Sequence, residues 1–339
     1  MKQKDIYIHI GYPKTGTTTL QNYLFPEHSQ IDYVRSKGSN FSFITDVFYS
    51  RENAFKKKKT EIKKELEAYS KSCKTNKIVY SEESFTSFSM FFRFEPIPYI
   101  YTLEPNSIAR KLGCAFIDTN VFNSSKVILT IRRQDELLKS MYAQVYNLAF
   151  KRFSHTNSFQ KFLKYAFSEN SDGFILDAIN YNDSVLEYEK IFGNGNVCVL
   201  VYEEFKLNPK NYIKKLASFI GVDEQEAMNL IENKHDNKRS SESGYMSDER
   251  NLKELINYYK NKLLGKRQLG IKARWLHRLL ESVYVPGRKL IDISFDEGQI
   301  KYLNEMFAEG NQSLSDRHQL DLCKYGYFIK NAKSECDLE

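Results

Sequence analysis

Short apolar runs of strand length recur along the chain and alternate with longer segments of helical periodicity. The strand-like runs are residues 6–10, 77–80, 126–131 and 196–202. The helical patterns are residues 18–24, 55–73, 135–150, 158–167, 182–192 and 211–220. Strand-length runs separated by amphipathic helices favour a parallel, helix-covered sheet. We therefore predict an α/β fold with a central parallel sheet flanked by helices, in which ligands bind beyond the carboxyl ends of the strands.

The first strand-like run leads into a loop rich in glycine and threonine and then into a helical segment. Gly11 and Gly16 have the glycine spacing of a Walker A loop, G-x-x-x-x-G-K-[ST]. Thr17 stands where that motif has its lysine, and the lysine of this loop, Lys14, comes earlier. The backbone N–H groups of such a loop, with the positive end of the next helix, can still hold a phosphate. The loop therefore predicts a P-loop-like nucleotide site whose chemistry is not ATP hydrolysis.

The sequence from Tyr12 to Thr19 resembles the 5′-phosphosulfate loop of sulfotransferases that use 3′-phosphoadenosine 5′-phosphosulfate (PAPS), roughly Y-P-K-[ST]-G-T-T. The resemblance implies that PAPS is the co-substrate, that 3′-phosphoadenosine 5′-phosphate (PAP) is the product, and that no metal is required. It implies that Lys14 is catalytic and reaches the oxygen between phosphorus and sulfur, where negative charge develops. It also implies that the loop holds the 5′-phosphate through Lys14, Thr15, Gly16, Thr17, Thr18 and Thr19.

A second phosphate site is predicted where the run 126–131 ends. In the same family an arginine ends a strand, a serine follows two helical turns later, and both bind the 3′-phosphate. Arg132 and Ser140 have that spacing, and the planar guanidinium of arginine can bind two phosphate oxygens. Arg133 is a rival by position, but adjacent side chains of a strand face opposite ways, so only one of the two arginines should point at the ligand.

The last strand-like run is followed by Tyr-Glu-Glu-Phe-Lys-Leu-Asn-Pro, beginning at Tyr202. This segment resembles the Y-E-[DE]-h-x-x-[DN]-P segment of the family, which implies that Tyr202 lies near the adenine. A structural tyrosine at a strand end is the alternative. The resemblance continues through 211–222, 307–311 and 325–327, and the segment 181–192 is typical of bacterial members. Residues 56–77 and 251–294 have no match.

Transfer of a sulfuryl group to a hydroxyl needs a base near the acceptor. Glu82 and Glu83 follow the run 77–80, which places two acids at a strand end. Carbohydrate-acting and bacterial sulfotransferases carry a catalytic glutamate at about this point, and Glu83 fits that register better than Glu82. Small-molecule members use a histidine, for which His155 is the rival, because His9 is expected to be a packed core residue. A solvated loop end explains the two acids equally simply.

Residues 233–250 are polar and lack hydrophobic periodicity, which predicts a long loop. Family members close a basic loop over the cofactor at this point, so Lys238 and Arg239 are candidate cofactor-binding residues, although the usual following glycine is missing. We predict a single sulfotransferase domain over 1–339. It has a nucleotide-binding core at 1–232, a candidate cofactor-closing loop at 233–250 and a C-terminal helical part at 251–339.

Composition and charge narrow the possible partners. The net charge of +7 suits an anionic ligand. The lysine run 56–59 is followed by glutamates at helical spacing, which favours an exposed helix over a nucleic-acid site. The basic region 260–290 is a candidate for peripheral membrane contact, and no apolar run is long enough to span a membrane. Five scattered cysteines, with no metal-ligand spacing and no signal sequence, predict reduced thiols and a cytoplasmic location.

The predicted function is therefore transfer of a sulfuryl group from PAPS to a hydroxyl or amine. A glutamate base and a bacterial-type tail favour a carbohydrate acceptor on a glycan or glycolipid; a small alcohol or phenol is the alternative. A P-loop NTPase or kinase is disfavoured because the Walker lysine is absent, although residues 233–236 match N-K-x-D. A non-catalytic nucleotide-fold binding protein would be expected to lack Lys14 or Arg132, and both are present.

Overall fold

The computed structural model describes residues 4–35, 42–83, 85–86, 105–146, 154–168, 174–232, 245–247, 250–251, 284–285 and 290–330. The chain divides into two compact units. Unit 1 comprises Met1–Leu138, Ala166–Lys238 and Asp296–Glu339, and unit 2 comprises Lys139–Tyr165 and Arg239–Phe295. Within the described residues, no helix is both long enough and apolar enough to cross a membrane. That the chain acts as a single domain stays a prediction.

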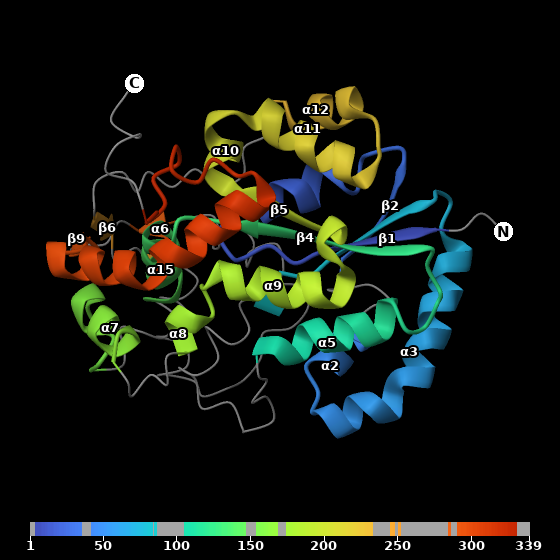
Figure 1. Cartoon of the computed structure of the whole chain (residues 1–339), viewed down its shortest axis with the longest axis horizontal. Helices are drawn as coiled ribbons and strands as arrows, with labels where there is room; N and C mark the ends of the chain where they lie inside the picture. The colour runs from blue at the N-terminus through green and yellow to red at the C-terminus, as the bar shows by residue number, and fades with distance from the viewer. Residues whose placement is uncertain are drawn as a thin grey trace. The chain divides into compact units, whose positions relative to one another are not determined.

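Unit 1 is built on a sheet of five parallel strands (Figure 1). The strand order is β2-β3-β1-β4-β5. The strands are β1 (Asp5–His9), β2 (Ile31–Arg35), β3 (Lys77–Ser81), β4 (Ser124–Ile131) and β5 (Val197–Val201). The predicted α/β fold with a central parallel sheet is confirmed. β2 was not predicted from the sequence, because an edge strand with polar positions gives a weak apolar signal.

The strand order reverses direction at β1. After β1, the chain forms β2 and β3 on one side of it and then crosses to form β4 and β5 on the other. In open parallel sheets, ligands bind at such a reversal, outside the carboxyl ends of the strands. The loop after β1 lies at this point, between the ends of β3 and β4.

Helices cover both faces of the sheet (Figure 1). On one face, alternate strand residues such as Tyr7, Val79 and Leu200 form a core with η1 (Leu20–Leu24), α11 (Pro209–Ile220) and α12 (Glu224–Ile231). The residues between them face the other way, because strand side chains alternate. There α9 (Tyr181–Phe192) contacts β4 and β5, and α5 (Pro105–Phe116) packs on α9.

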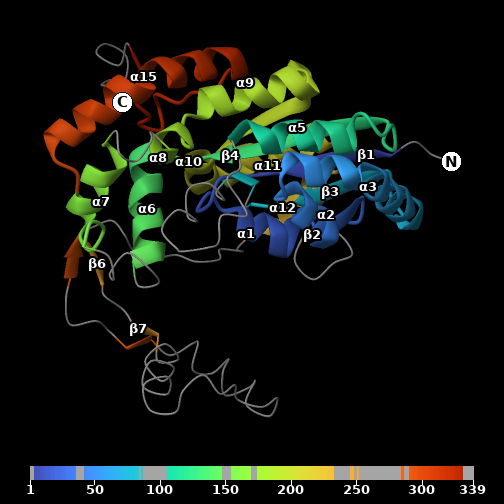
Figure 2. The same ribbon diagram turned by 90° about the horizontal axis from the view of Figure 1, so that it is seen from below.

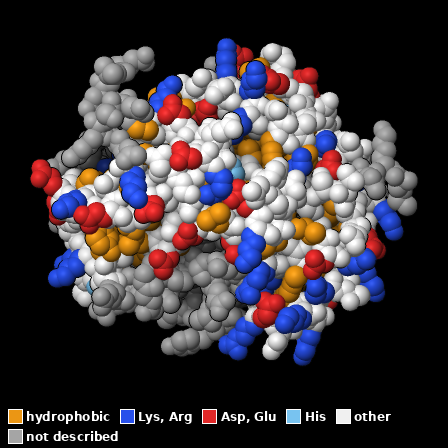
Figure 3. Space-filling model, in the orientation of Figure 1, with side chains coloured by type: hydrophobic (Ala, Val, Ile, Leu, Met, Phe, Trp, Pro, Cys, Tyr) orange, Lys and Arg blue, Asp and Glu red, His pale blue; other side chains and the backbone are white. Residues whose placement is uncertain are grey.

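The lysine-rich segment forms α3 (Glu52–Ser72), which lies beside α2 (Ser42–Phe48) and α5 (Figures 1 and 2). Phe55, Ile62 and Leu66 are its buried residues. Basic and acidic side chains are mixed over this region (Figure 3), and Lys58 pairs with Glu61 at 2.5 Å. This helix is therefore a solvated face with mixed charges.

The remaining helices of unit 1 connect these layers. Among the described residues they are α1 (Thr17–Thr19), α8 (Phe174–Asp177), η5 (Asn194–Asn196), α10 (Tyr202–Leu207) and α15 (Glu297–His318). The carboxylate of Glu189 on α9 joins α15 through Arg317 Nε at 2.9 Å and His318 Nε2 at 2.9 Å. Since Glu189 is buried, this paired cluster fixes α15 on α9 and sets where the chain after α15 begins.

Helix α6 (Gln134–Tyr146) begins in unit 1 and continues into unit 2. Unit 2 also contains most of α7 (Phe159–Ala166) and two small antiparallel ladders. In these, β6 (Tyr245–Ser247) pairs with β9 (Leu290–Asp292), and β7 (Arg250–Asn251) pairs with β8 (Tyr284–Val285). The expected loop 233–250 therefore ends in strands, because backbone pairing with distant segments leaves no local hydrophobic period.

The cysteines depart from expectation at one position. Cys73, Cys114 and Cys198 are free thiols, whereas Cys323 is disulfide-bonded, with its partner outside the described residues. The prediction of five reduced thiols is therefore wrong for Cys323. Spacing along the chain could not reveal this bond, because a disulfide depends on the distance between two cysteines in the folded chain.

Candidate functional site

The loop after β1 has a backbone shaped to hold an anion. Lys14 has a φ of 65° and Gly16 a φ of 77°, both in the left-handed region. Such alternations turn neighbouring N–H groups toward one concave side, where they can bind phosphate oxygens. Glycine is required at position 16 for a second reason, since a Cβ there would lie 3.1 Å from ring atoms of Tyr202 and Phe205. Lysine in this region is strained, which is common where a side chain must be aimed.

The threonines of the loop have different environments. The Thr15 hydroxyl donates to the Tyr12 carbonyl oxygen at 2.5 Å and is fully buried, so this side chain closes the loop. Thr17 and Thr19 are also buried, while Thr18 is partly exposed. Of the four, Thr18 therefore offers the most accessible side chain.

Arg132, which follows β4, contacts this loop. Its Nη1 donates to the Lys14 carbonyl oxygen at 3.1 Å, and its Nη2 lies 3.3 Å from a carboxylate oxygen of Glu136. The guanidinium lies over the Tyr202 ring, 5.1 Å from the ring centre. The structure thus brings together the loop, Arg132 and Tyr202, which the sequence analysis proposed separately.

The adjacent Arg133 turns away from the loop. Its guanidinium is paired with Asp135, with Nη2 and Oδ2 2.6 Å apart. It also lies against Gly326 of the segment after α15, where an added Cβ would be 3.1 Å from Nη1. Gly326 has a φ of 74°, so both its backbone and this close approach favour glycine. Of the two arginines, Arg132 is the one that contacts the loop.

The two candidate acids lie beside the same loop. The Glu82 N–H donates to the His9 carbonyl oxygen at 3.0 Å, which ties the end of β3 to the end of β1. The Thr86 hydroxyl is 3.1 Å from the Gly11 carbonyl oxygen and 3.0 Å from that of Glu83. Glu82 is buried, whereas Glu83 is partly exposed. Glu83 is therefore the acid that an acceptor can reach more easily.

A buried polar cluster supports the ends of β1 and β3. His9 Nδ1 lies 2.8 Å from Ser81 Oγ, to which Gln21 Nε2 also donates at 2.8 Å. Gln21 belongs to η1, a π-helical segment of the kind often found at functional sites. Burial lowers the pKa of His9 to about 3, so this imidazole is neutral. The expectation of a packed core histidine is confirmed.

The other predicted residues belong to unit 2 or lie outside the described residues. Ser140 and His155 belong to unit 2, where His155 is exposed with its ring 5.2 Å from that of Tyr165. Lys238 and Arg239 lie outside the described residues. Their binding and catalytic roles stay predictions.

Three side chains that the sequence did not single out form hydrogen bonds around the peptide bond between Arg132 and Arg133. They are Tyr181 at the start of α9, Glu203 on α10 and Tyr327 after α15. Burial raises the pKa of both phenols well above the usual value, and it also raises the pKa of Glu203. Glu203 belongs to the Tyr-Glu-Glu motif, which was a usable signal; Tyr181 and Tyr327 had none beyond the resemblance of their segments.

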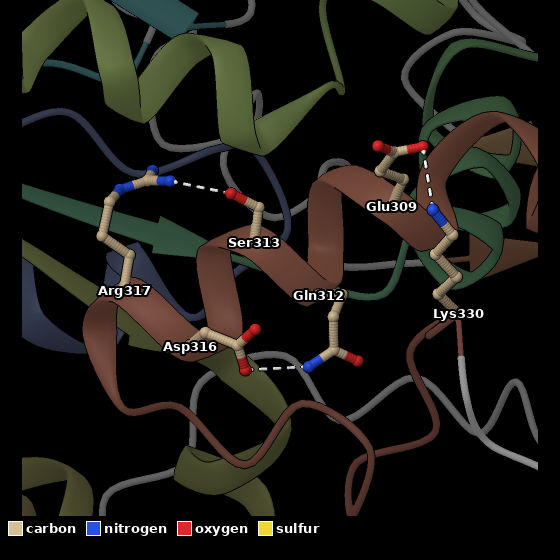
Figure 4. A pocket seen from close by; sticks show the side chains of 6 residues that line it. All are labelled: Glu309, Gln312, Ser313, Asp316, Arg317 and Lys330. Carbon is tan, nitrogen blue, oxygen red and sulfur yellow. Dashed lines mark hydrogen bonds and ion pairs between the residues drawn. The ribbon is translucent and has the colours of Figure 1, made fainter.

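A pocket of about 570 Å³ lies elsewhere in unit 1, on α15 and the segment after it (Figure 4). Its lining side chains largely satisfy one another: Glu309 with Lys330 at 3.5 Å, Gln312 with Asp316 at 2.8 Å, and Arg317 with Ser313 at 3.2 Å. None of the predicted site residues lines it. Over the part of the chain that is described, no cluster of three or more His, Cys, Asp or Glu residues could hold a metal ion.

Solved structures of several sulfotransferases are similar to this chain. The alignment with a sulfotransferase from Alicyclobacillus acidocaldarius covers 79% of this chain and 98% of that protein's chain, at 15% identity and a TM-score of 0.44. A mouse sulfotransferase complexed with PAP covers 95% and 90%, at 15% identity and a TM-score of 0.43. A retinol dehydratase in complex with androsterone and inactive cofactor PAP covers 92% and 80%, at 12% identity and a TM-score of 0.35.

No curated protein matches the chain. The model of the sulfotransferase domain family, in contrast, matches residues 3–270. That match contains the loop after β1, both candidate acids, Arg132 and Tyr202, and it spans well over half of the chain. The chain therefore belongs to the sulfotransferase domain family and is an enzyme of the sulfotransferase class.

Proposed function

We propose that this enzyme transfers the sulfuryl group of PAPS to a hydroxyl or amine of a carbohydrate, on a glycan or glycolipid. The single observation that carries the nucleotide assignment is the position of Arg132. Its guanidinium contacts the Lys14 carbonyl oxygen and the Tyr202 ring, so the residues proposed to bind the 5′-phosphate, the 3′-phosphate and the adenine adjoin one another. A Walker-type NTPase site does not require this combination.

The residues present fit a nucleotide with a 3′-phosphate. The Arg132 side chain is 12% exposed, and its buried Nε has no hydrogen-bond partner among the described residues. A buried, unpartnered donor on a cation is costly unless an acceptor binds there. A phosphate oxygen supplies such an acceptor, and the planar fork of arginine suits two of them.

Bound PAPS supplies the sulfuryl group, and the side chains of this protein bind and orient it. The backbone N–H groups from Lys14 to Thr18 and the Thr18 hydroxyl hold the 5′-phosphate, while the Thr19 N–H donates to the Gly16 carbonyl oxygen at 3.1 Å. The Lys14 ammonium stabilises the negative charge that develops on the leaving phosphate oxygen. Glu83 accepts the proton of the acceptor hydroxyl, and its partial exposure beside the loop supports this role.

The acceptor part of the proposal is supported by the acids at the end of β3. Glu82 and Glu83 lie at the loop, and Glu83 is partly exposed there. A carboxylate base at this position is what the resemblance associates with carbohydrate acceptors. A cytoplasmic location and membrane contact through 260–290 remain part of the proposal. The three free cysteines favour a cytoplasmic location, whereas the disulfide at Cys323 does not.

A transfer assay with sulfur-labelled PAPS tests this function. The purified chain is incubated with panels of glycans, glycolipids, alcohols and phenols, and labelled products are separated from PAPS. Labelled glycan or glycolipid is expected, with no label transferred by the Lys14→Ala variant. Exclusive labelling of phenols would replace the carbohydrate acceptor by a small molecule. Failure to bind PAP would contradict the nucleotide assignment.

A further inference from the structure

The peptide bond between Arg132 and Arg133 is held on both sides by side chains from other elements. The Tyr181 hydroxyl donates to the Arg132 carbonyl oxygen at 2.5 Å. The Arg133 N–H donates to Glu203 Oε1 at 3.1 Å. This peptide directs Arg132 toward the loop and Arg133 toward Asp135, so its orientation decides which arginine faces the nucleotide.

The carboxylate of Glu203 is itself held in place. Its other oxygen, Oε2, accepts a hydrogen bond from the Tyr327 hydroxyl at 2.9 Å. Tyr327 is buried, and its phenol has a pKa far above neutral, so it acts as the donor. The segment that carries it is anchored by Asn311 on α15, whose Nδ2 donates to the Phe328 carbonyl oxygen at 3.1 Å.

Tyr181 also connects this peptide to the phosphate loop. Its ring packs edge-on against that of Tyr12, with centroids 4.8 Å apart. The Tyr12 hydroxyl donates to Ser184 Oγ at 3.0 Å, one turn along the same helix, α9. Because Tyr181 is fully buried between loop and peptide, a displacement of α9 would move both phosphate-binding elements together.

We propose that Tyr181, Glu203 and Tyr327 are positioning residues that hold the Arg132–Arg133 peptide so that Arg132 selects nucleotides with a 3′-phosphate. This inference rests on the proposed function, since it concerns how the same site recognises its nucleotide. The three side chains act through Arg132 and touch no part of the ligand. Their effect should therefore appear in the preference for the 3′-phosphate and not in nucleotide binding as a whole.

The test compares PAP with adenosine 5′-monophosphate (AMP), which lacks the 3′-phosphate, by titration calorimetry on the full chain. Tyr181→Phe keeps the ring contact with Tyr12 and removes one hydrogen bond; we expect it to lower the PAP-to-AMP affinity ratio about fivefold. Tyr327→Phe should act in the same direction. Glu203→Ala should lower the ratio about tenfold, while Glu203→Gln, which keeps an acceptor oxygen, should stay within about threefold of wild type.

Two controls separate positioning from general damage to the structure. Tyr80→Phe removes a hydroxyl that is equally buried and lies 2.7 Å from Thr45 Oγ1, away from the peptide. Glu204→Ala removes the neighbouring carboxylate, which accepts from Asn211 Nδ2 at 2.6 Å. Both should leave the PAP-to-AMP ratio within about twofold of wild type. Thermal unfolding of every variant shows that each is folded at the titration temperature.

A double variant tests whether the effect passes through Arg132. Once Arg132→Ala is present, adding Tyr181→Phe should change PAP affinity by less than about twofold, because the side chain being positioned is gone. An undiminished fivefold loss in that background would overturn the proposal. Equal loss of PAP and AMP affinity in the Tyr181 and Glu203 variants would also overturn it. The same holds if Glu203→Ala and Glu203→Gln lower the PAP-to-AMP ratio equally.

The wild-type titration separates a failure of the proposed nucleotide site from a failure of the proposed positioning role. A wild-type chain that binds PAP and AMP equally would contradict the proposed nucleotide site, whatever the variants do. A wild-type chain that prefers PAP, with variants that keep this preference in full, would leave the proposed function standing and refute the role of Tyr181, Glu203 and Tyr327.

Discussion

Replacing Arg132 by alanine should weaken binding of PAP far more than binding of AMP. The side chain is 12% exposed, so its charge already lies in a partly desolvated place. Nη1 is committed to the Lys14 carbonyl oxygen. Nε, which has no partner among the described residues, and Nη2, which faces Glu136, form the two-donor edge of the guanidinium that can bind a 3′-phosphate.

The size of the effect follows from these two donors. Each hydrogen bond between charged groups contributes about 1.5–3 kcal/mol. Because Nη2 must leave Glu136 to bind phosphate, we use the lower end of this range for each hydrogen bond. The two hydrogen bonds to the 3′-phosphate then contribute about 3 kcal/mol, so their loss lowers PAP affinity on the order of 100-fold. AMP should lose only the support of the Lys14 carbonyl contact, worth about 1 kcal/mol or about fivefold. Because PAP loses this support as well, the PAP-to-AMP ratio should fall by the contribution of the two donors alone, on the order of 100-fold.

The neighbouring arginine is the matched control for this experiment. Arg133→Ala removes the same charge one residue away, where the side chain pairs with Asp135 and lies against Gly326. Both variants are titrated with PAP and AMP by calorimetry. For Arg133→Ala, the PAP-to-AMP affinity ratio should stay within about threefold of wild type. The reasoning fails if Arg133→Ala lowers the ratio as much as Arg132→Ala, or if Arg132→Ala weakens both nucleotides equally.

Three further predictions concern the loop, the base and the buried histidine. Lys14→Ala should lower the rate of sulfuryl transfer at least about 100-fold while PAP affinity, measured by titration, stays within about tenfold; normal turnover would contradict the catalytic role. Glu83→Gln should slow transfer about 10²- to 10⁴-fold with unchanged PAP binding, whereas Glu82→Gln should not; the reverse result in the labelled-PAPS assay would move the base to Glu82. Burial gives His9 a folded-state pKa of about 3 against 6.5 when unfolded, so between these values only the unfolded chain binds the proton. The free energy of unfolding, from urea titrations, should therefore fall by up to about 1.4 kcal/mol per pH unit as pH drops below 6.5, and His9→Asn should remove this slope; an unchanged slope would show that His9 does not cause it.

Local sequence was enough to predict most elements of unit 1. The runs 6–10, 77–80, 126–131 and 196–202 correspond to β1, β3, β4 and β5, because strands buried on both faces are nearly continuous apolar runs. β2 was missed because an edge strand has a weaker apolar pattern. The strands β6 to β9 of unit 2 gave no local signal, since each has only two or three residues and depends on pairing with a distant segment.

The sequence by itself determined the turn of the loop. Lys14 and Gly16 both have a positive φ, and glycine adopts that conformation readily, so the turn is encoded within a few residues. The order Tyr-Glu-Glu after the last strand likewise identified Tyr202. Such features are visible in a sequence because backbone conformation depends mainly on neighbouring residues.

Only the tertiary structure decided which residues meet. It placed Arg132 on the carbonyl of Lys14 and turned Arg133 toward Gly326. It also gathered Tyr181, Glu203 and Tyr327 around one peptide bond. These contacts join segments far apart in the chain, and they depend on strand order and helix packing. Because a pattern of apolar and polar positions specifies the faces of each element but not its neighbours, the sequence alone could not predict them.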